Sequence, residues 1–513
     1  HSFPEPSIRL QLKLKLKLKL PWRSLASSSS SPSSSASVLT SSPASSPPTP
    51  MASSTCRRPY KRRSPSSPST PGPSPLYPPP PPPPSAVLSL ELHPRNAVRK
   101  TAHRNYSSLI TSTLRRDAAR VTSLHARLEL ALAGVKISDL TPLKEPDAAS
   151  EIRPESLGSP LVSGISQGSG EYFARVGFGS PSRLMYVVPD TGSDINWIQC
   201  RPCASCYTQA DPVFDPRLSS SYVRLPCGSP KCSSLEVTNC RDGGACSYEV
   251  SYGDGSYTMG DFATETLSFG SRGGSVSGIA FGCGHDNEGL FVGSDGLIGL
   301  GGGPLSLTSQ LKAPGFSYCL VDRDSNAAST IDFDSARPAD SITAPLSRNR
   351  RINTFLYVGL DGLSVGPESL SVPSSLFQMD AATGRGGVIV DSGTSVTRLP
   401  TQAYNALRDA FRRMTRDLPA APSGGYEIFD TCYDLSSQRS VRVPTVAFRL
   451  AGGKSLPLPA RNFLVPVDSA GTFCLAFAPT TSSLTIIGNI QQQGTRVSYD
   501  LAHMVVGFSL NKC

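Results

Sequence analysis

A short acidic turn occurs twice in this chain of 513 residues, and each copy follows a run of apolar residues. The first copy reads VVPDTGS over residues 187–193, and the second reads VIVDSGT over residues 388–394. Further along the chain each copy is followed by two apolar residues and a glycine, at 297–299 and 486–488. A single turn of this kind arises easily by chance. Two copies in matching contexts indicate a fold made of two related halves.

The chemistry of paired carboxyl groups explains why such a turn would be duplicated. Hydrolysis of a peptide bond needs a base that activates water and an acid that protonates the amide, and two neighbouring carboxyl groups supply both. Like charges about 3 Å apart cannot both ionise, so the pair shares one proton and titrates as a unit. We therefore predict that Asp190 and Asp391 form a catalytic pair, in preference to two unrelated turn-forming residues.

The residues beside the two aspartates have matching supporting roles. We expect tight turns at Gly192 and Gly393, hydrogen bonds from Ser193 and Thr394 to the outer carboxylate oxygens, and hydroxyls of Thr191 and Ser392 that tie the turns together. Pro189 departs from this pattern, because proline lacks the N–H that a central strand uses. It predicts some distortion at Asp190 in an enzyme that is still active.

Composition divides the chain into two unlike parts. Residues 1–150 hold 21 of the 49 Lys and Arg residues and 7 of the 39 Asp and Glu residues, so the remainder carries 28 basic and 32 acidic residues. The formal net charge of +10 thus belongs to the N-terminal part, and a nucleic-acid-binding function is disfavoured. Residues 1–90 are rich in Ser and Pro and poor in acidic residues. We expect them to be disordered, as a low-complexity or targeting segment, with Met51 as an alternative start.

The remaining sequence changes from a helical to a β pattern. Apolar residues recur at three and four positions over 97–136, with Arg between them, which predicts one or two basic amphipathic helices. From residue 168 onward, short Val-, Ile-, Tyr- and Phe-rich runs alternate with turn residues, and the one long helical candidate is 402–416. This pattern predicts an all-β protein of two lobes. The chain has no apolar stretch long enough to span a bilayer.

Cysteine usage indicates an oxidising compartment. One cysteine lies early in the chain, and the other twelve lie at positions 200, 203, 206, 227, 232, 240, 246, 283, 319, 432, 474 and 513. An even number favours a disulfide framework, whose connectivity sequence does not specify. The spacing of Cys200, Cys203 and Cys206 also suits zinc, but the region has no nearby histidine. We expect disulfides and no metal.

Several motifs resemble the pepsin-like aspartic protease family, and specifically its plant nepenthesin-type branch. They include GSGEYFARVGFGSP at 168–181, DTGSDINWIQC at 190–200, VSYGDGSYTMGDFATET at 250–266, FSYCLVDRD at 316–324 and TIIGNIQQQGTRVSYD at 485–500. The resemblance runs from about residue 90 to Cys513 and implies a bilobal all-β fold with the active-site cleft between two related lobes. It implies that Tyr252 lies on a β-hairpin flap over the substrate and that Trp197 supports it. It also identifies 200–246 as a cysteine-rich insertion.

The same resemblance implies a domain order and a precursor. Residues 91–165 are similar to the family's propeptide, 168–345 to the N-terminal lobe and 346–513 to the C-terminal lobe. Lys and Arg of the propeptide are expected to pair with cleft carboxylates at neutral pH, and acid weakens such pairs. We therefore expect a zymogen that matures under acidic conditions by cleavage within 145–168.

The predicted function is an aspartic endopeptidase that acts on proteins or peptides at acidic pH, as a monomer without a cofactor. The cysteines favour the secretory route to the apoplast or vacuole, and the acid-poor N-terminus favours a plastid as the alternative. An alternative interpretation is a catalytically silent binding protein of the same fold, like the plant xylanase inhibitors, which typically lack an intact pair of catalytic aspartates. A third reading, a nucleic-acid-associated protein, depends on the basic N-terminus alone.

Overall fold

A computed structural model describes residues 87–98, 105–135 and 171–513, except 242, 253–255, 271–273, 290 and 292. The predictions of a disordered segment up to residue 86 and of a cleavage site within 145–168 fall outside the described residues. No helix in the described ranges is long and apolar enough to cross a membrane.

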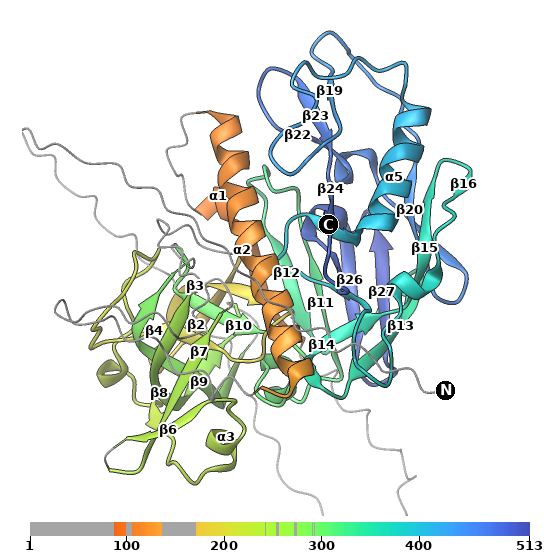
Figure 1. Cartoon of the computed structure of the whole chain (residues 1–513). Coiled ribbons are helices and arrows are strands. Elements are labelled where there is room, and N and C mark those ends of the chain that lie inside the picture. The colour runs from red at the N-terminus through yellow and green to blue at the C-terminus, as the bar shows by residue number, and fades with distance from the viewer. Residues whose placement is uncertain are drawn as a thin grey trace, which may run out of the picture. The chain divides into compact units, whose positions relative to one another are not determined.

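Strands dominate the described chain, as the sequence predicts, and they form two lobes (Figure 1). The first lobe contains β2 (Tyr172–Phe178), β3 (Arg183–Asp190), β4 (Trp197–Gln199), β5 (Val223–Arg224), β6 (Thr238–Arg241), β7 (Ala245–Ser251), β8 (Tyr257–Ser268), β9 (Ser275–Glu288), β10 (Gly296–Gly299), β11 (Gly315–Cys319) and β12 (Ser329–Phe333), with short helices α3 (Pro230–Ser233) and α4 (Leu307–Gln310).

The second lobe contains β13 (Ile342–Asn349), β14 (Ile352–Val358), β15 (Leu360–Val365), β16 (Glu368–Ser369), β17 (Val388–Val390), β18 (Thr397–Pro400), β19 (Cys432–Asp434), β20 (Val446–Leu450), β21 (Lys454–Pro457), β22 (Leu464–Pro466), β23 (Thr472–Leu475), β24 (Phe477–Thr480), β25 (Thr485–Ile487), β26 (Thr495–Asp500) and β27 (Val505–Leu510). Its helix α5 (Thr401–Met414) corresponds to the predicted helix at 402–416.

Each repeated turn follows a strand that is paired in parallel with its downstream apolar partner. In the first lobe, β3 pairs with β10, so that Val188 lies opposite Leu297. In the second lobe, β17 pairs with β25, so that Ile389 lies opposite Ile486. The internal repeat of the sequence is therefore a structural repeat, and both aspartates stand at corresponding strand ends.

A continuous set of antiparallel strands joins the lobes. β13 pairs with β27, β27 with β26, β26 with β11, and β11 with β12. Tyr499 on β26 donates its hydroxyl hydrogen to the Val390 carbonyl at 3.0 Å, directly before Asp391. The shared strands thus fix the second acidic turn relative to the first lobe.

The segment before the first lobe contains β1 (Leu88–Pro94), α1 (Arg95–Val98) and the long helix α2 (Tyr106–Ala133). β1 pairs with both β12 and β2. Its leucines Leu90 and Leu92 are fully buried. Residues 88–90 therefore form a strand, which corrects the prediction of a disordered segment up to residue 90. Leu88, Leu90 and Leu92 alternate with polar residues, which is the pattern of a half-buried strand.

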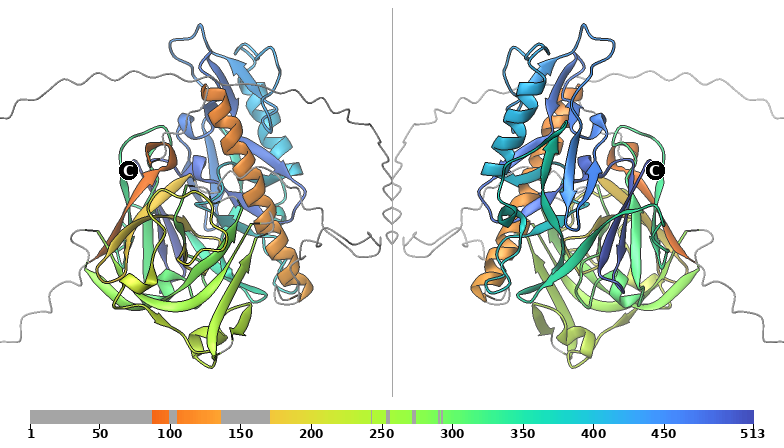
Figure 2. Two further views of the ribbon diagram at one scale, coloured as in Figure 1. Left: turned by 90° about the vertical axis from the view of Figure 1, so that its left-hand side faces the viewer. Right: turned by 90° about the vertical axis from the view of Figure 1, so that its right-hand side faces the viewer.

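Helix α2 lies along the junction of the two lobes in all three views (Figures 1 and 2). Asn105 caps its N-terminus by accepting a hydrogen bond from the Ser108 N–H at 2.9 Å, and Gly134 ends it in the left-handed conformation. Its apolar stripe packs on the second lobe, with Ile110 and Leu114 in one cluster and Val121, Leu124 and Leu128 in another. The amphipathic pattern predicted for 97–136 therefore forms this helix.

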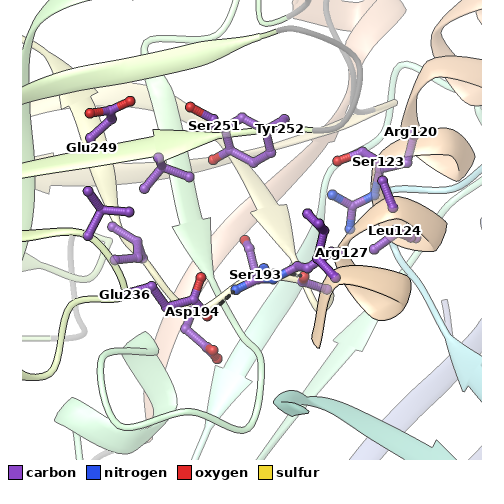
Figure 3. A pocket seen from close by; sticks show the side chains of 16 residues that line it. Arg120, Ser123, Leu124, Arg127, Ser193, Asp194, Glu236, Glu249, Ser251 and Tyr252 are labelled. Atoms are coloured by element: carbon purple, nitrogen blue, oxygen red, sulfur yellow. Dashed lines mark hydrogen bonds and ion pairs between the residues drawn. The ribbon is translucent and has the colours of Figure 1, made fainter. Parts of the chain in front are cut away.

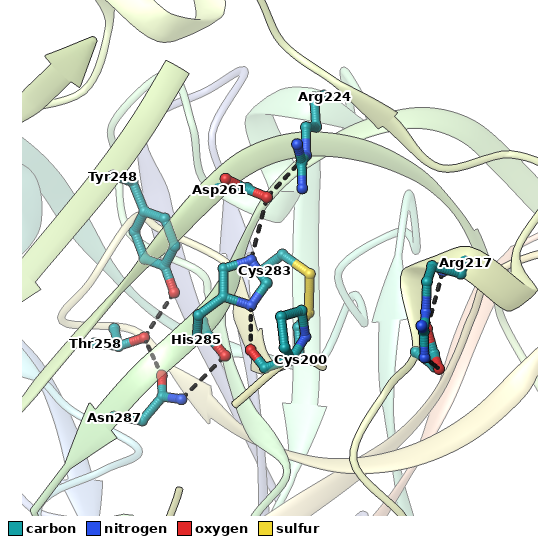
Figure 4. The surroundings of a disulfide bond; sticks show 12 residues. Cys200, Arg217, Arg224, Tyr248, Thr258, Asp261, Cys283, His285 and Asn287 are labelled. Carbon is teal, nitrogen blue, oxygen red and sulfur yellow. Dashed lines mark hydrogen bonds and ion pairs between the residues drawn. A yellow bond between two sulfur atoms is a disulfide. The ribbon is translucent and has the colours of Figure 1, made fainter. Parts of the chain in front are cut away.

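All twelve cysteines from position 200 onward form disulfides. The pairs are Cys200–Cys283, Cys203–Cys206, Cys227–Cys240, Cys232–Cys246, Cys319–Cys513 and Cys432–Cys474. The predicted disulfide framework is confirmed, and Cys200, Cys203 and Cys206 are left with no thiolate for the alternative zinc site. Figure 4 shows Cys200–Cys283 beside a polar network in which Asp261 accepts from Arg224 at 2.8 Å and contacts His285 at 3.1 Å.

Candidate active site

The two acidic turns meet at the centre of the molecule. Asp190 is 1% exposed and Asp391 is fully buried. The turns are linked directly, because the Ser392 N–H donates to the Thr191 hydroxyl at 3.1 Å and the Ser392 hydroxyl donates to the Pro189 carbonyl at 3.0 Å. The Thr191 hydroxyl donates in turn to the Val390 carbonyl at 3.2 Å. This reciprocal set of bonds holds the two strand ends together.

Arg120 of helix α2 lies between the two aspartates. Its Nη2 donates to Oδ1 of Asp190 and, at 2.9 Å, to Oδ1 of Asp391. Its Nη1 reaches Oδ2 of Asp190 at 2.9 Å, and its Nε reaches Oδ2 of Asp391 at 3.1 Å. Burial alone would lower the pKa of Arg120, but the two carboxylates raise it above its ordinary value. The guanidinium therefore stays charged and satisfies both aspartates at once.

The carboxylate of Asp391 receives further hydrogen bonds from hydroxyl groups. Thr394 donates to Oδ2 at 2.6 Å, and the single hydroxyl hydrogen of Thr191 is shared between the Val390 carbonyl and Oδ1 of Asp391 at 3.3 Å. Burial acts to raise the pKa of Asp391, but Arg120 and these hydroxyls outweigh burial and hold the pKa below its usual value. Asp391 is thus ionised in this arrangement.

The carboxylate of Asp190 receives a different set. The Gly192 N–H donates to Oδ1 at 2.9 Å, and Arg120 supplies the other donors. The Ser193 hydroxyl, expected to bond this carboxylate, is buried and has no hydrogen-bond partner among the described residues. The two turns share a sequence pattern and differ in their hydrogen bonds.

The glycines of the two turns make room for Arg120. Neither Gly192 nor Gly393 has a positive φ, so their backbone conformation does not by itself require glycine. A Cβ atom at Gly192 would collide with the Arg120 guanidinium and lie 2.8 Å from Leu124. A Cβ at Gly393 would lie 3.1 Å from the Arg120 Nε. Glycine is needed here because another group approaches the backbone closely.

Tyr252 and Trp197 lie on the first lobe beside the pair. The fully buried Trp197 donates its Nε1–H to the Tyr252 hydroxyl at 3.0 Å. Phe291 packs edge-on against both rings, with centroids 4.9 Å from Trp197 and 5.0 Å from Tyr252. Tyr252 follows β7 directly, and residues 253–255 lie outside the described residues. The indole and the rings around it hold the tyrosine in one orientation.

Pro189 fits its strand without displacing Asp190. Tyr186 and Asp190 direct their carbonyls to the β10 side, where they accept from Asp295 and Leu300 at 2.6 and 2.8 Å. Because backbone groups alternate along a strand, Pro189 faces the opposite side, where the register with β2 ends at Val187. The missing N–H therefore costs no bond to β10. The expected distortion at Asp190 is not seen.

Helix α2 makes further charged contacts along the cleft. Arg116 pairs with the buried Glu171 at 2.7 Å, and Asp117 pairs with Arg398. Arg127 donates to the Gly192 carbonyl at 3.2 Å. The sequence analysis predicted that basic residues of this stretch pair with cleft carboxylates, but not which ones. Their spacing could have identified them, because positions 116, 120 and 127 lie on one face of the helix.

The helix leaves part of the cleft open. A pocket of about 120 Å³ lies between α2 and the first lobe. Its lining includes Arg120 and Tyr252, which Figure 3 labels. The lining also includes Leu124, Arg127, Asp194 and Glu236. Among the described residues no group of three His, Cys, Asp or Glu side chains is placed to hold a metal.

Two β lobes that each present an Asp-(Thr/Ser)-Gly turn to a common centre define the pepsin-like class of proteins. Solved structures with this fold include edgp (TM-score 0.56, 20% identity, 66% of this chain and 91% of that one) and conglutin gamma from lupine seeds (TM-score 0.53, 19% identity, 66% and 92%). Residues 172–333 match the family description Xylanase inhibitor N-terminal, and residues 356–510 match Xylanase inhibitor C-terminal.

Curated relatives narrow the class. Protein ASPARTIC PROTEASE IN GUARD CELL 2 of Arabidopsis thaliana is 47% identical over 84% of this chain and 88% of its own length. Aspartyl protease family protein 2 of the same plant is 49% identical over 80% and 83%. Aspartic proteinase nepenthesin-1 of Nepenthes gracilis is 37% identical over 80% and 94%. The chain belongs to the pepsin-like aspartic protease family, in its plant nepenthesin-type branch.

Proposed function

We propose that this protein is an aspartic endopeptidase in which Asp190 and Asp391 activate one water molecule. The observation that carries the proposal is that one nitrogen of Arg120 contacts an oxygen of each aspartate. Once α2 leaves, a water molecule fits in the same place and contacts both carboxyl groups. The ionised aspartate removes a proton from that water, which attacks the peptide carbonyl, and the protonated aspartate donates to the leaving amide.

Substitution of each aspartate tests this proposal. Asp190→Asn and Asp391→Asn each remove one half of the acid–base pair while keeping the size of the side chain. We expect both to abolish hydrolysis of an unfolded protein at acidic pH, because neither carboxyl group alone supplies both proton transfers. Activity that survives either change would show that the pair is assigned wrongly. Circular dichroism of each variant checks that the fold is retained.

We also propose that the described chain is a latent precursor that matures in acid. Arg120 occupies the position of the water and prevents a substrate from reaching the pair. The depressed pKa of Asp391 stabilises the docked helix above the ordinary carboxyl pKa, and that stabilisation is lost as pH falls through the lowered pKa. Acid therefore weakens docking of α2. An oxidising, acidic compartment of the secretory route, the apoplast or vacuole, suits both this behaviour and the six disulfides.

Incubation of the purified precursor at about pH 4 and at pH 7 tests latency. We expect self-processing in acid and an intact precursor at neutral pH. Equal processing at both values would contradict the proposal.

The matches to xylanase inhibitor domains give a second candidate function, a binding protein without catalysis. Pepstatin distinguishes the two, because it inhibits only a protein that cleaves substrate.

A further inference from the structure

Asp117 on α2 makes a second buried contact with the lobe that carries Asp391. Its Oδ1 accepts from the backbone N–H groups of Ser395 at 2.6 Å and Val396 at 3.0 Å. Its Oδ2 accepts from Nη2 of Arg398. The Asp117 side chain is fully buried, and that of Arg398 is 7% exposed. Three donors around one carboxylate form a complete binding pocket for an acidic group.

The pocket belongs to the second lobe and not to the helix. Ser395 and Val396 directly follow the Asp391 turn, and Arg398 lies on β18, between β24 and β25. The Arg398 Nη1 also donates to the Val396 carbonyl at 2.8 Å, which orients the guanidinium. The donors therefore stay in place when α2 leaves. When α2 leaves, the Arg398 guanidinium and the two N–H groups lose their carboxylate partner while keeping their mutual arrangement, so the emptied pocket favours another carboxylate.

We propose that this pocket is a carboxylate-binding subsite of the cleft and selects substrates with Asp or Glu near the cleaved bond. The inference rests on the proposed endopeptidase function. Asp117 precedes Arg120 by three residues, or about 4.5 Å along the helix axis. An extended peptide advances about 3.3 Å per residue. The subsite thus accepts a side chain within about two or three residues of the scissile bond.

The donor set distinguishes an acid from its amide. A carboxylate offers two acceptor oxygens to Arg398 and the two N–H groups, whereas Asn or Gln offers one oxygen and places an NH2 group against a donor. We expect kcat/KM for a Glu or Asp peptide to exceed that of the matching Gln or Asn peptide by roughly tenfold to a hundredfold. Because the carboxyl group must be ionised, this ratio falls as pH drops below about 4.

A peptide series on the acid-processed wild-type protein tests the subsite. Each peptide carries one Asp, Asn, Glu or Gln at a single position within four residues of the cleaved bond. We expect one position with a strong acid preference. The same Glu-to-Gln ratio should fall to about one in Arg398→Gln and to an intermediate value in Arg398→Lys, while Arg496→Gln, which removes a 2.6 Å pair with Asp332, keeps the wild-type ratio.

Separate outcomes overturn the inference and the proposed function. Cleavage without an acid preference at any position overturns the subsite and leaves the endopeptidase in place. An acid preference that persists in Arg398→Gln also overturns it. Cleavage of no peptide by the processed wild-type protein overturns the proposed function itself. If Arg398→Gln does not fold, the wild-type ratio decides, since a preference that does not shrink between about pH 5 and pH 3 contradicts binding of an ionised side chain.

Discussion

The two acidic turns have nearly the same sequence and unequal surroundings. Asp391 is held by the hydroxyls of Thr394 and Thr191 as well as by Arg120, whereas Asp190 receives one backbone N–H and the guanidinium. The hydroxyl of Ser193, which corresponds to Thr394, makes no hydrogen bond within the described residues. A duplicated motif thus gives two carboxylates with different hydrogen-bond donors.

Helix α2 also contacts the two lobes in different ways. Its apolar stripe packs on the second lobe, where Asp117 also fills the Arg398 pocket, while Arg116 and Arg127 face the first lobe. Arg120 is the only side chain among the described residues of α2 that bonds both aspartates. Substitutions that affect both acidic turns, helix α2 alone or one turn alone therefore separate the contributions of the helix and of each turn to docking and activity.

The largest effect is expected from Arg120→Leu, which removes the donor common to both turns. Loss of one partner from a buried ion pair costs about 3–5 kcal/mol. We expect docking of α2 to weaken at least a hundredfold, so that the precursor processes itself at a higher pH than the wild type. Gel analysis of processing between pH 3 and pH 7 gives the midpoint. Arg115→Leu is the matched control, because Arg115 is exposed on the same helix. Equal midpoints for both variants would show that Arg120 does not maintain latency.

A smaller effect is expected from His125→Gln on the side of α2 that faces the second lobe. Burial and the nearby Arg398 lower the pKa of His125 to about 4, although Glu129 and the Leu484 backbone act against this. A free histidine has a pKa of about 6.5, so the released helix binds a proton that the docked helix excludes. Docking therefore weakens as pH falls from about 6.5 toward 4, by roughly tenfold after allowance for partial exposure.

Glutamine stays neutral throughout this pH range, so docking of α2 in the His125→Gln variant loses this part of its pH dependence. His125→Gln should process several-fold more slowly than the wild type near pH 5, with its midpoint displaced to lower pH. His503→Gln serves as the control, because His503 is exposed and pairs only with Asp500 among the described residues. A wild-type pH profile in His125→Gln would show that the carboxylates alone sense acid.

The difference between the turns themselves is tested by Thr394→Ala and Ser193→Ala. Thr394 donates at 2.6 Å to an ionised carboxylate, and a bond of this kind contributes about 1.5–3 kcal/mol. In the precursor we expect thermal unfolding to detect the loss of Thr394 and almost no loss for Ser193. After α2 leaves, the Ser193 hydroxyl is free to turn toward Asp190, so both variants should lower kcat. Equal destabilisation of the precursor by both would contradict the inequality of the turns.

The sequence predicted some residues of the active site and missed others, for physical reasons. The repeat identified Asp190 and Asp391 because the same local pattern is written twice. An amphipathic period predicted α2, but which arginine enters the cleft depends on how the helix docks, which is a tertiary property. The pairing of Cys200 with Cys283 and the contact of Asp117 with Arg398 likewise join distant segments. The prediction of distortion at Pro189 used the general rule that proline is unfavourable in a central strand. The rule does not apply here, because the pairing of β3 with β2 ends before Pro189.

The smallest effect is expected from Tyr252→Phe, which concerns a feature of the first lobe only. The change removes the acceptor of the Trp197 Nε1–H and leaves a buried donor unpaired, at a cost of about 1 kcal/mol. The ring and its packing on Phe291 remain, so kcat/KM on a peptide should fall by only a few-fold. Tyr252→Ala also removes the ring and should reduce the rate further or alter specificity. If Tyr252→Phe lowered the rate as much as Asp190→Asn, the hydroxyl would take part in proton transfer, and the asymmetry between the lobes would extend to the chemistry.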